Sequence, residues 1–239
     1  MIPLRDSLRA RRFPVVTVGI VALNVAAFLW EIGVGGVERP AVVSWAVVPS
    51  QLVQAVSGNG LALREGATAL TAMFLHGDLW HLLGNMWFLW IFGDNVEDRT
   101  GRGGFVAFYL VCGLAATAAQ VAMEPTSQMP MLGASGAVAG VLGAYLRLYP
   151  RARVLTLIPI FIFLQFAELP AVGFLGFWFV IQLVSSWLGV GGVAWWAHIA
   201  GFLVGLVLSL FLGGWGGSEG EGRGRGKRGM PQGSQRRGR

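Results

Sequence analysis

Four polar side chains stand within long apolar stretches of the chain: His81, Asn85, Ser135 and His198. A polar group inside hydrocarbon is costly unless it is paired, so each of them needs a reason to be there. A serine hydroxyl beside an imidazole can act as a nucleophile, because the imidazole takes the hydroxyl proton and later returns it to a leaving amine. The residue types therefore indicate acyl-transfer chemistry, with Ser135 as nucleophile and His198 as general base.

The same stretches supply groups that can stabilise a developing negative charge. His81 and Asn85 are four residues apart, on one face of a helix, and both can donate hydrogen bonds. The main-chain N–H of Ser135, at the start of its helix, can add a third donor to such an oxyanion hole. The outer halves of these stretches hold no Asp or Glu beyond Asp78, so we expect a Ser-His dyad without a third carboxylate.

Each of these residues also has a simpler explanation. A serine in a Gly- and Ala-rich helix more often packs closely and bonds back to its own helix, and a histidine near a helix end is more often interfacial. Asn85 can hold two helices together. His76 and His81 suggest a metal site, but their spacing of five and the lack of an adjacent Glu do not fit an H-E-x-x-H zinc motif. No metal and no cofactor is therefore expected.

The composition indicates that these residues lie in a protein surrounded by lipid. Of 239 residues, 54% are hydrophobic and 13% charged, against roughly 25% charged in a soluble domain, and the mean hydropathy is +0.62. Long apolar runs separated by short charged clusters predict one membrane-embedded bundle. The single cysteine, Cys112, lies within an apolar run, so the chain has no disulfide framework.

We predict an all-α membrane protein with six transmembrane helices, each close to the ~20 residues needed to cross. The expected spans lie near residues 14–33, 78–97, 104–123, 134–149, 170–187 and 194–213. All Lys and Arg except Arg39 and Arg64 fall in four clusters, at the two ends of the chain and after the second and fourth spans. Such clusters mark the cytoplasmic side, and an even number of spans returns both termini to it.

Three regions follow from this pattern. Residues 1–13 form a basic cytoplasmic N-terminus, 14–213 the six-helix domain, and 214–239 a Gly/Arg-rich cytoplasmic tail that is expected to be disordered. The first apolar run is too long for a typical signal peptide and is followed by further spans. The tail can attract anionic headgroups. Nucleic-acid binding is not expected, because aromatic residues are absent beyond Trp215.

Two connections lie outside the expected spans. The apolar stretch from Val154 to Phe166 is short, contains Pro159 and is followed by Glu168, so we expect an interfacial segment rather than another span. The connection from Val34 to Gly77 is external and long enough to be functional. It is either a partly lipid-immersed element or an ordinary surface loop.

Depth and helix packing bring the polar residues together. Asn85, Ser135 and His198 all lie ~18–22 Å above the inner membrane face, counted from the cytoplasmic ends of their spans at ~1.5 Å per residue. In a hydrocarbon core ~30 Å thick, this level is roughly 10 Å below the outer surface. Glycine pairs that allow close helix approach follow both catalytic candidates. They are Gly136 and Gly140 after Ser135, and Gly201 and Gly205 after His198. We therefore expect the fourth and sixth spans to meet there.

Three motifs follow one another along the chain. The stretch HGDLWHLLGNMWFLWIFGDNVEDRTG contains H-x-x-x-x-H-x-x-x-N and then G-x-x-x-E-x-x-x-G, the latter at Gly93, Glu97 and Gly101. The string GASGAVAG begins at Gly133 and contains G-x-S-G, and AHIAGFLVG contains A-H-x-x-G-x-x-x-G. Together they resemble the motifs of the rhomboid family of intramembrane serine proteases, and the resemblance extends from about residue 14 to residue 213.

The resemblance implies a six-helix rhomboid-like bundle in a lipid bilayer that hydrolyses transmembrane protein substrates within or near their membrane segment. It assigns the dyad to Ser135 and His198, and the oxyanion hole to His81, Asn85 and the Ser135 N–H. It also implies helix-packing roles for a set of residues, namely Gly93, Glu97, Gly101, Gly133, Gly136, Gly140, Gly201 and Gly205. Family members open their site by movement of the fifth helix and an external cap, here near residues 171–186 and 126–132.

Two features depart from the family pattern. The external connection offers only Arg64, in LALREGAT, where many members carry a Trp-Arg pair. Ala139 occupies a position where some members have an aromatic residue beneath the histidine, so another residue must support the His198 ring.

Ser and Arg are not jointly enriched at the start of the chain, so we expect a bacterial plasma membrane, with the site opening to the outer side, rather than an organelle reached by a transit peptide.

Two other functions compete with proteolysis. An inactive relative that binds or chaperones membrane proteins usually lacks the serine or the histidine, and both are present here. A proton or solute channel could use His81, Asn85 and His198 as a relay, but it leaves the GASGA string unexplained. The residues do not indicate a natural substrate or an oligomeric state.

Overall fold

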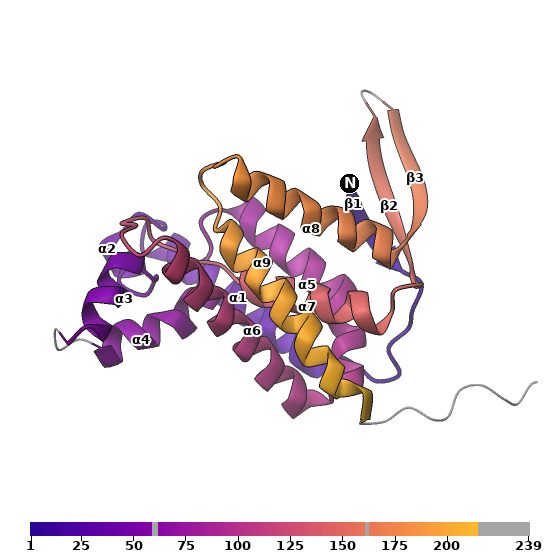
Figure 1. Cartoon of the computed structure of the whole chain (residues 1–239), viewed down its shortest axis with the longest axis horizontal. Helices are drawn as coiled ribbons and strands as arrows, with labels where there is room; N and C mark the ends of the chain where they lie inside the picture. The colour runs from indigo at the N-terminus through magenta and orange to yellow at the C-terminus, as the bar shows by residue number, and fades with distance from the viewer. Residues whose placement is uncertain (59–61, 161–162, 215–239) are drawn as a thin grey trace, which may run out of the picture.

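The computed structural model describes residues 1–58, 62–160 and 163–214, and its main feature is a bundle of longer helices (Figure 1). These helices are α1 (Val15–Gly33), α5 (Leu79–Thr100), α6 (Arg102–Met123), α7 (Ser135–Leu148), α8 (Ala171–Trp187) and α9 (Trp195–Leu208), the last followed by the 3₁₀ helix η2 (Ser209–Gly214). They fall on the six ranges expected from the apolar runs. The disordered tail predicted from the sequence lies, beyond Gly214, outside the described residues.

Length and hydropathy identify fewer spans than the sequence pattern suggests. Three of the described helices are long and apolar enough to cross a membrane: Val15–Gly33, Arg102–Met123 and Trp195–Leu212. Helices α7 and α8 are apolar but shorter. The chain is thus a mostly helical membrane protein, and the count of six spans stays a prediction.

The connection between α1 and α5, predicted from the sequence to be external, is folded rather than irregular. It contains α2 (Pro40–Val43), α3 (Pro49–Val56), α4 (Ala62–Thr71) and the 3₁₀ helix η1 (Ala72–Phe74), which gather at one end of the bundle in Figure 1. Val42, Ala46 and Leu75 form a small hydrophobic core of their own. Val47 and Met131 exchange two backbone hydrogen bonds, of 3.0 and 2.7 Å, which tie this connection to the segment before α7.

A three-stranded antiparallel sheet corrects the all-α prediction. Strand β2 (Arg153–Ile160) lies between β1 (Ile2–Asp6) and β3 (Phe163–Pro170). The stretch expected to be an interfacial segment therefore forms a β-hairpin, because its Val, Ile, Leu, Thr and Phe side chains favour strands. In Figure 1 this hairpin projects from the bundle near the start of α8, and Phe163 and Phe166 are about two-thirds exposed, at 66% and 67%.

Strand β1 fixes the N-terminal segment to the bundle. The Asp6 carboxylate accepts hydrogen bonds from the Tyr145 hydroxyl and, at 3.0 Å, from the Asn95 amide. The Trp87 indole donates to the Pro3 carbonyl at 2.6 Å. Burial raises the pKa of Asp6, while the bond from Tyr145 opposes that shift. The basic N-terminus predicted from the sequence is therefore partly a strand.

The buried carboxylate of Glu97 holds the first turn of α1. It accepts the backbone N–H groups of Val16 and Thr17 at 3.0 and 2.7 Å, and the Thr17 hydroxyl at 2.8 Å. The first N–H groups of a helix have no partner within it and carry partial positive charge, so a carboxylate satisfies them. One turn earlier on α5, a Cβ at Gly93 would come within 3.2 Å of Thr17. Glu97 and Gly93 thus lie where α5 and α1 meet.

Helices α7 and α9 approach until their backbones touch. A Cβ on Gly201 would overlap the carbonyl oxygen of Gly136, and a Cβ on Gly205 would overlap that of Gly140. A Cβ on Gly143 would likewise overlap the Phe202 carbonyl. Because the obstacles are backbone atoms of a packed helix, a larger side chain can be accommodated only if the helices separate.

Replacing Gly205 by alanine should therefore destabilise the protein. We expect Gly205→Ala to cost about 2–3 kcal/mol through overpacking, which corresponds to a melting temperature roughly 5–10 °C lower. The control is Gly176→Ala on α8, where nothing lies within 4 Å of an added Cβ. Thermal unfolding of both variants in detergent, followed by tryptophan fluorescence, measures the difference, and equal melting temperatures would contradict the packing described.

Candidate active site

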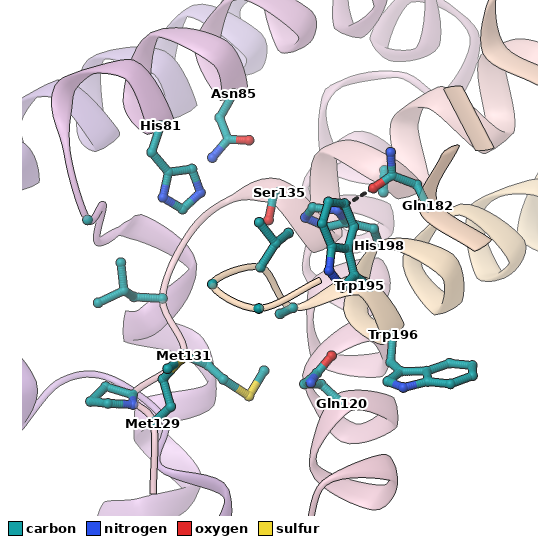
Figure 2. A pocket seen from close by; sticks show the side chains of 18 of the residues that line it. His81, Asn85, Gln120, Met129, Met131, Ser135, Gln182, Trp195, Trp196 and His198 are labelled. Carbon is teal, nitrogen blue, oxygen red and sulfur yellow. Dashed lines mark hydrogen bonds between the residues drawn. The ribbon is translucent and has the colours of Figure 1, made fainter. Parts of the chain in front are cut away.

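All four polar residues singled out from the sequence line one cavity of about 1040 Å³. His81 and Asn85 come from α5, Ser135 from α7 and His198 from α9. Figure 2 shows His81 and Asn85 on one side of Ser135 and His198 on the other. Three helices therefore bring these four residues to one cavity, which α6 and α8 also line.

Ser135 is the first residue of α7 and follows a glycine in an unusual conformation. Gly133 has φ +129°, which favours glycine, and its N–H donates to the Ala72 carbonyl at 2.8 Å. The first backbone N–H groups of a helix have no partner within that helix. The N–H of Ser135 is in this position, as an oxyanion donor requires.

The first turn of α5 presents His81 toward Gly133. The Asp78 side chain caps this helix by accepting the His81 N–H at 2.8 Å. A Cβ on Gly133 would lie 2.8 Å from both Cε1 and Nε2 of the His81 ring. Glycine at this position therefore allows the imidazole to reach the start of α7.

His76 is a site residue whose role was not predicted from the sequence. Its Nε2 lies 3.0 Å from the Asn85 amide nitrogen, and its ring packs edge-on against His81 with centroids 5.1 Å apart. Burial, and secondarily the neighbouring His81, lower the pKa of His76 to about 4. The ring is then neutral at physiological pH, so Nε2 accepts from Asn85 and orients its amide.

The backbone of His76 is held as well. Its N–H donates to the carboxylate of Glu31 on α1, with distances of 3.1 and 3.3 Å to the two oxygens. The first histidine of the H-x-x-x-x-H stretch is the signal that could have revealed this role. In the sequence, His76 suggests only a metal ligand, and its spacing from His81 does not fit that role.

The His198 ring is supported from α8 and from its own helix. Nδ1 lies 2.8 Å from the Gln182 side-chain oxygen. Trp178 lies against the ring with centroids 6.1 Å apart and an interplanar angle of 34°, and Trp195 meets it edge-on at 6.0 Å. These three residues contact the imidazole in a chain that has Ala139 at the position where some members of the family it resembles have an aromatic residue.

The first turn of α9 has a partner on α6. Gln120 is buried, and its side-chain oxygen accepts the N–H of Ala197 at 3.2 Å. A side chain thus satisfies one of the orphan donors at the start of the helix that carries His198. Gln120 and Gln182 are both polar residues in apolar helices, and that feature could have identified them in the sequence.

The residues beside the two catalytic candidates touch across the α7–α9 contact. A Cβ on Gly136 would lie 3.9 Å from the Cβ of Ala197, so the residue after Ser135 meets the residue before His198. Within residues 1–58, 62–160 and 163–214, no hydrogen bond joins the Ser135 hydroxyl to the His198 ring. Such bonds are often long in unliganded sites and tighten when substrate binds. The dyad accordingly stays a prediction.

These features describe a helical membrane protein with a cavity in its bundle, lined by His81, Asn85, Ser135 and His198 among mostly apolar residues. The rhomboid domain family matches residues 64–215, which is more than half of the chain. The protein belongs to the rhomboid family.

Named relatives support the same family. The chain is 30% identical to the mitochondrial Rhomboid protein 1 of Saccharomyces cerevisiae over 149 residues, 58% of this chain and 40% of the relative. It is 33% identical to Rhomboid protease GluP of Bacillus subtilis over 134 residues, 56% of this chain and 24% of the relative. Identity to the human mitochondrial presenilin-associated rhomboid-like protein is 30% over 149 residues, 61% of this chain and 36% of the relative. The chain thus spans less than half the length of these relatives.

Gly133→Ala should disturb the site more than the fold. The added Cβ meets the His81 ring, and the positive φ adds strain, so we expect His81 to move and serine reactivity to fall about 10- to 100-fold. The rate of labelling by a serine-directed fluorophosphonate measures this loss. Gly36→Ala is the control, because Gly36 also has a positive φ, +99°, but nothing within 4 Å. Equal labelling rates in the two variants would contradict the role of Gly133.

Proposed function

We propose that this protein is an intramembrane serine endopeptidase that cleaves membrane-anchored substrate proteins within or near their transmembrane segment. The observation that carries the proposal is the shared cavity, in which a helix-start serine and a histidine from a neighbouring helix face two further hydrogen-bond donors. Membership of a family that includes a protein named as a rhomboid protease supports it.

In the first half of the reaction, the Ser135 oxygen attacks the scissile carbonyl carbon while Nε2 of His198 takes the hydroxyl proton. The carbonyl oxygen becomes an oxyanion that accepts hydrogen bonds from His81, Asn85 and the Ser135 N–H. The tetrahedral intermediate collapses when His198 gives its proton to the leaving nitrogen, and the new amine departs. An ester between Ser135 and the substrate remains.

In the second half, water reverses these roles. His198 takes a proton from a water molecule, whose oxygen attacks the ester carbon under the same oxyanion donors. Collapse of the second intermediate returns the proton to the Ser135 oxygen and releases the new carboxyl terminus. The cavity supplies room for the water this step consumes. Each residue ends the cycle in its starting state.

The proposal includes the six-span arrangement, with both termini in the cytoplasm and the site opening to the outer side. The clusters of Lys and Arg support this orientation. The bacterial plasma membrane expected from the sequence also stays a proposal, because the yeast and human relatives are named as mitochondrial. Partners in the proposal are transmembrane substrates and lipid.

The test of this function is cleavage of a single-pass reporter protein in proteoliposomes. We expect Ser135→Ala and His198→Ala each to lower the cleavage rate by about 1,000-fold or more, since each removes one half of a unit that acts together. Ser44→Ala, a serine outside the cavity, is the control and should cleave like the wild type. Equal cleavage by all four proteins would refute the proposal, and a solute or proton flux abolished by His198→Ala would favour a channel.

The reporter helix itself should limit the rate. Its backbone is internally hydrogen-bonded and therefore closed to nucleophilic attack, so it must unwind locally before Ser135 can reach a carbonyl. Replacing Gly or Pro near the cut by Leu should lower the rate about tenfold, because Leu stabilises a helix relative to either residue. The same replacement far from the cut is the control. Unchanged cleavage after the near replacement would contradict a need for unwinding.

A further inference from the structure

A hydrogen bond between two helices determines which nitrogen of His198 carries the proton. Nδ1 lies 2.8 Å from Oε1 of Gln182, and an amide oxygen only accepts. The opposite orientation of the Gln182 amide would lose a hydrogen bond, because in the present one its Nε2 donates to the Trp178 carbonyl oxygen at 3.1 Å. A carbonyl oxygen only accepts, so it could not bond to Oε1 instead. Nδ1 therefore bears the proton of the neutral ring and Nε2 is left with its lone pair.

We propose that Gln182 is a positioning residue that holds His198 in the tautomer able to take the Ser135 proton, and that it makes this tautomer depend on the place of α8 against α9. The proposal rests on the proposed function, because the tautomer matters only if His198 is the general base. Gln182 acts through His198 and does not need to touch the substrate.

The burial of α8 supports this role. Its buried residues are Ala171, Phe174, Leu175 and Gln182, so beyond Leu175 the one buried side chain is polar. Ile181 and Leu183, on either side of it, are each 42% exposed. A polar side chain in an apolar setting is tolerated when its donors and acceptors are bonded, and an apolar residue would pack there at lower cost. The glutamine is therefore explained by its bond to His198 rather than by packing.

A second residue of α8 acts on the same ring. Trp178, one turn before Gln182, contacts His198 and also stacks on Phe202, one turn after His198, with centroids 6.0 Å apart. One turn of α8 thus supplies both the hydrogen bond to Nδ1 and an aromatic surface beside the imidazole. If this part of α8 leaves α9, His198 loses both contacts, and either ring nitrogen can then carry the proton. Among the described residues, His81 of α5 is the ionisable side chain that interacts electrostatically with His198.

The experiment compares three variants of the full chain in proteoliposomes with a transmembrane reporter. Gln182→Met keeps the length of the side chain without its acceptor, and we expect kcat per folded protein to fall about tenfold with KM changed less than twofold. Gln182→Glu keeps an acceptor and should restore most of the activity. It should also move the acidic limb of the pH–rate profile to higher pH, because a carboxylate favours the protonated ring. Ile181→Met, at an exposed neighbouring position outside the cavity, should match the wild type.

The outcomes separate positioning from simple packing. Folded fractions and melting temperatures are measured alongside turnover, so loss of fold is not counted as loss of activity. Turnover of Gln182→Met within twofold of wild type would overturn the proposal, and so would an equal loss in Gln182→Met and Gln182→Glu. If the wild type shows no cleavage that depends on Ser135, the proposed function fails and the role of Gln182 falls with it.

Discussion

The contact between the backbones of α7 and α9 is the constraint on which the site depends. Gly136 meets Gly201 and Gly140 meets Gly205, four residues further along each helix, so the two helices run side by side in a fixed register. Ser135 stands one residue before the first of these contacts, and His198 stands three residues before its counterpart. A sliding of one helix by a single turn, about 5.4 Å, would change which residues of α9 lie beside the start of α7. The glycines at the contact, which have no side chains, therefore determine where Ser135 and His198 lie relative to each other.

Helices α5, α8 and α1 contribute side chains and hydrogen bonds that α7 and α9 alone do not supply. Helix α5 places His81 and Asn85 in the cavity that Ser135 lines. His76, just before that helix, orients Asn85, and Glu31 of α1 holds the His76 backbone. Helix α8 supplies the hydrogen bond to His198. These contacts bring distant parts of the chain to one cavity in a low-dielectric bundle, where hydrogen bonds are strong and unpaired polar groups are costly. The polar network consequently specifies one arrangement of the helices around it.

The sequence predicts the helices well, because apolar runs, charged clusters and glycine spacing are local patterns. It predicts the sheet poorly. Ile2 to Asp6 is a short strand whose partner lies far along the chain, and the apolar hairpin has no helical or alternating signature that separates it from a membrane segment. Gln182 was missed for a different reason. It is a polar residue in an apolar helix like Asn85, but its contact with His198 depends on how α8 packs against α9, which no local pattern predicts.

The pairing of β1 with β2 has a consequence for biosynthesis. Ile2 pairs with Leu157 and Asp6 with Val154, so the first strand leaves the ribosome long before its partner exists. At about 5–20 residues per second, the N-terminal segment waits on the order of 10 s, while α1 and the helices after it enter the membrane. Tyr145 of α7, which donates to Asp6, is equally late. The sheet is therefore one of the last parts to assemble, and its closure joins the earliest residues of the polypeptide to a bundle that has already formed.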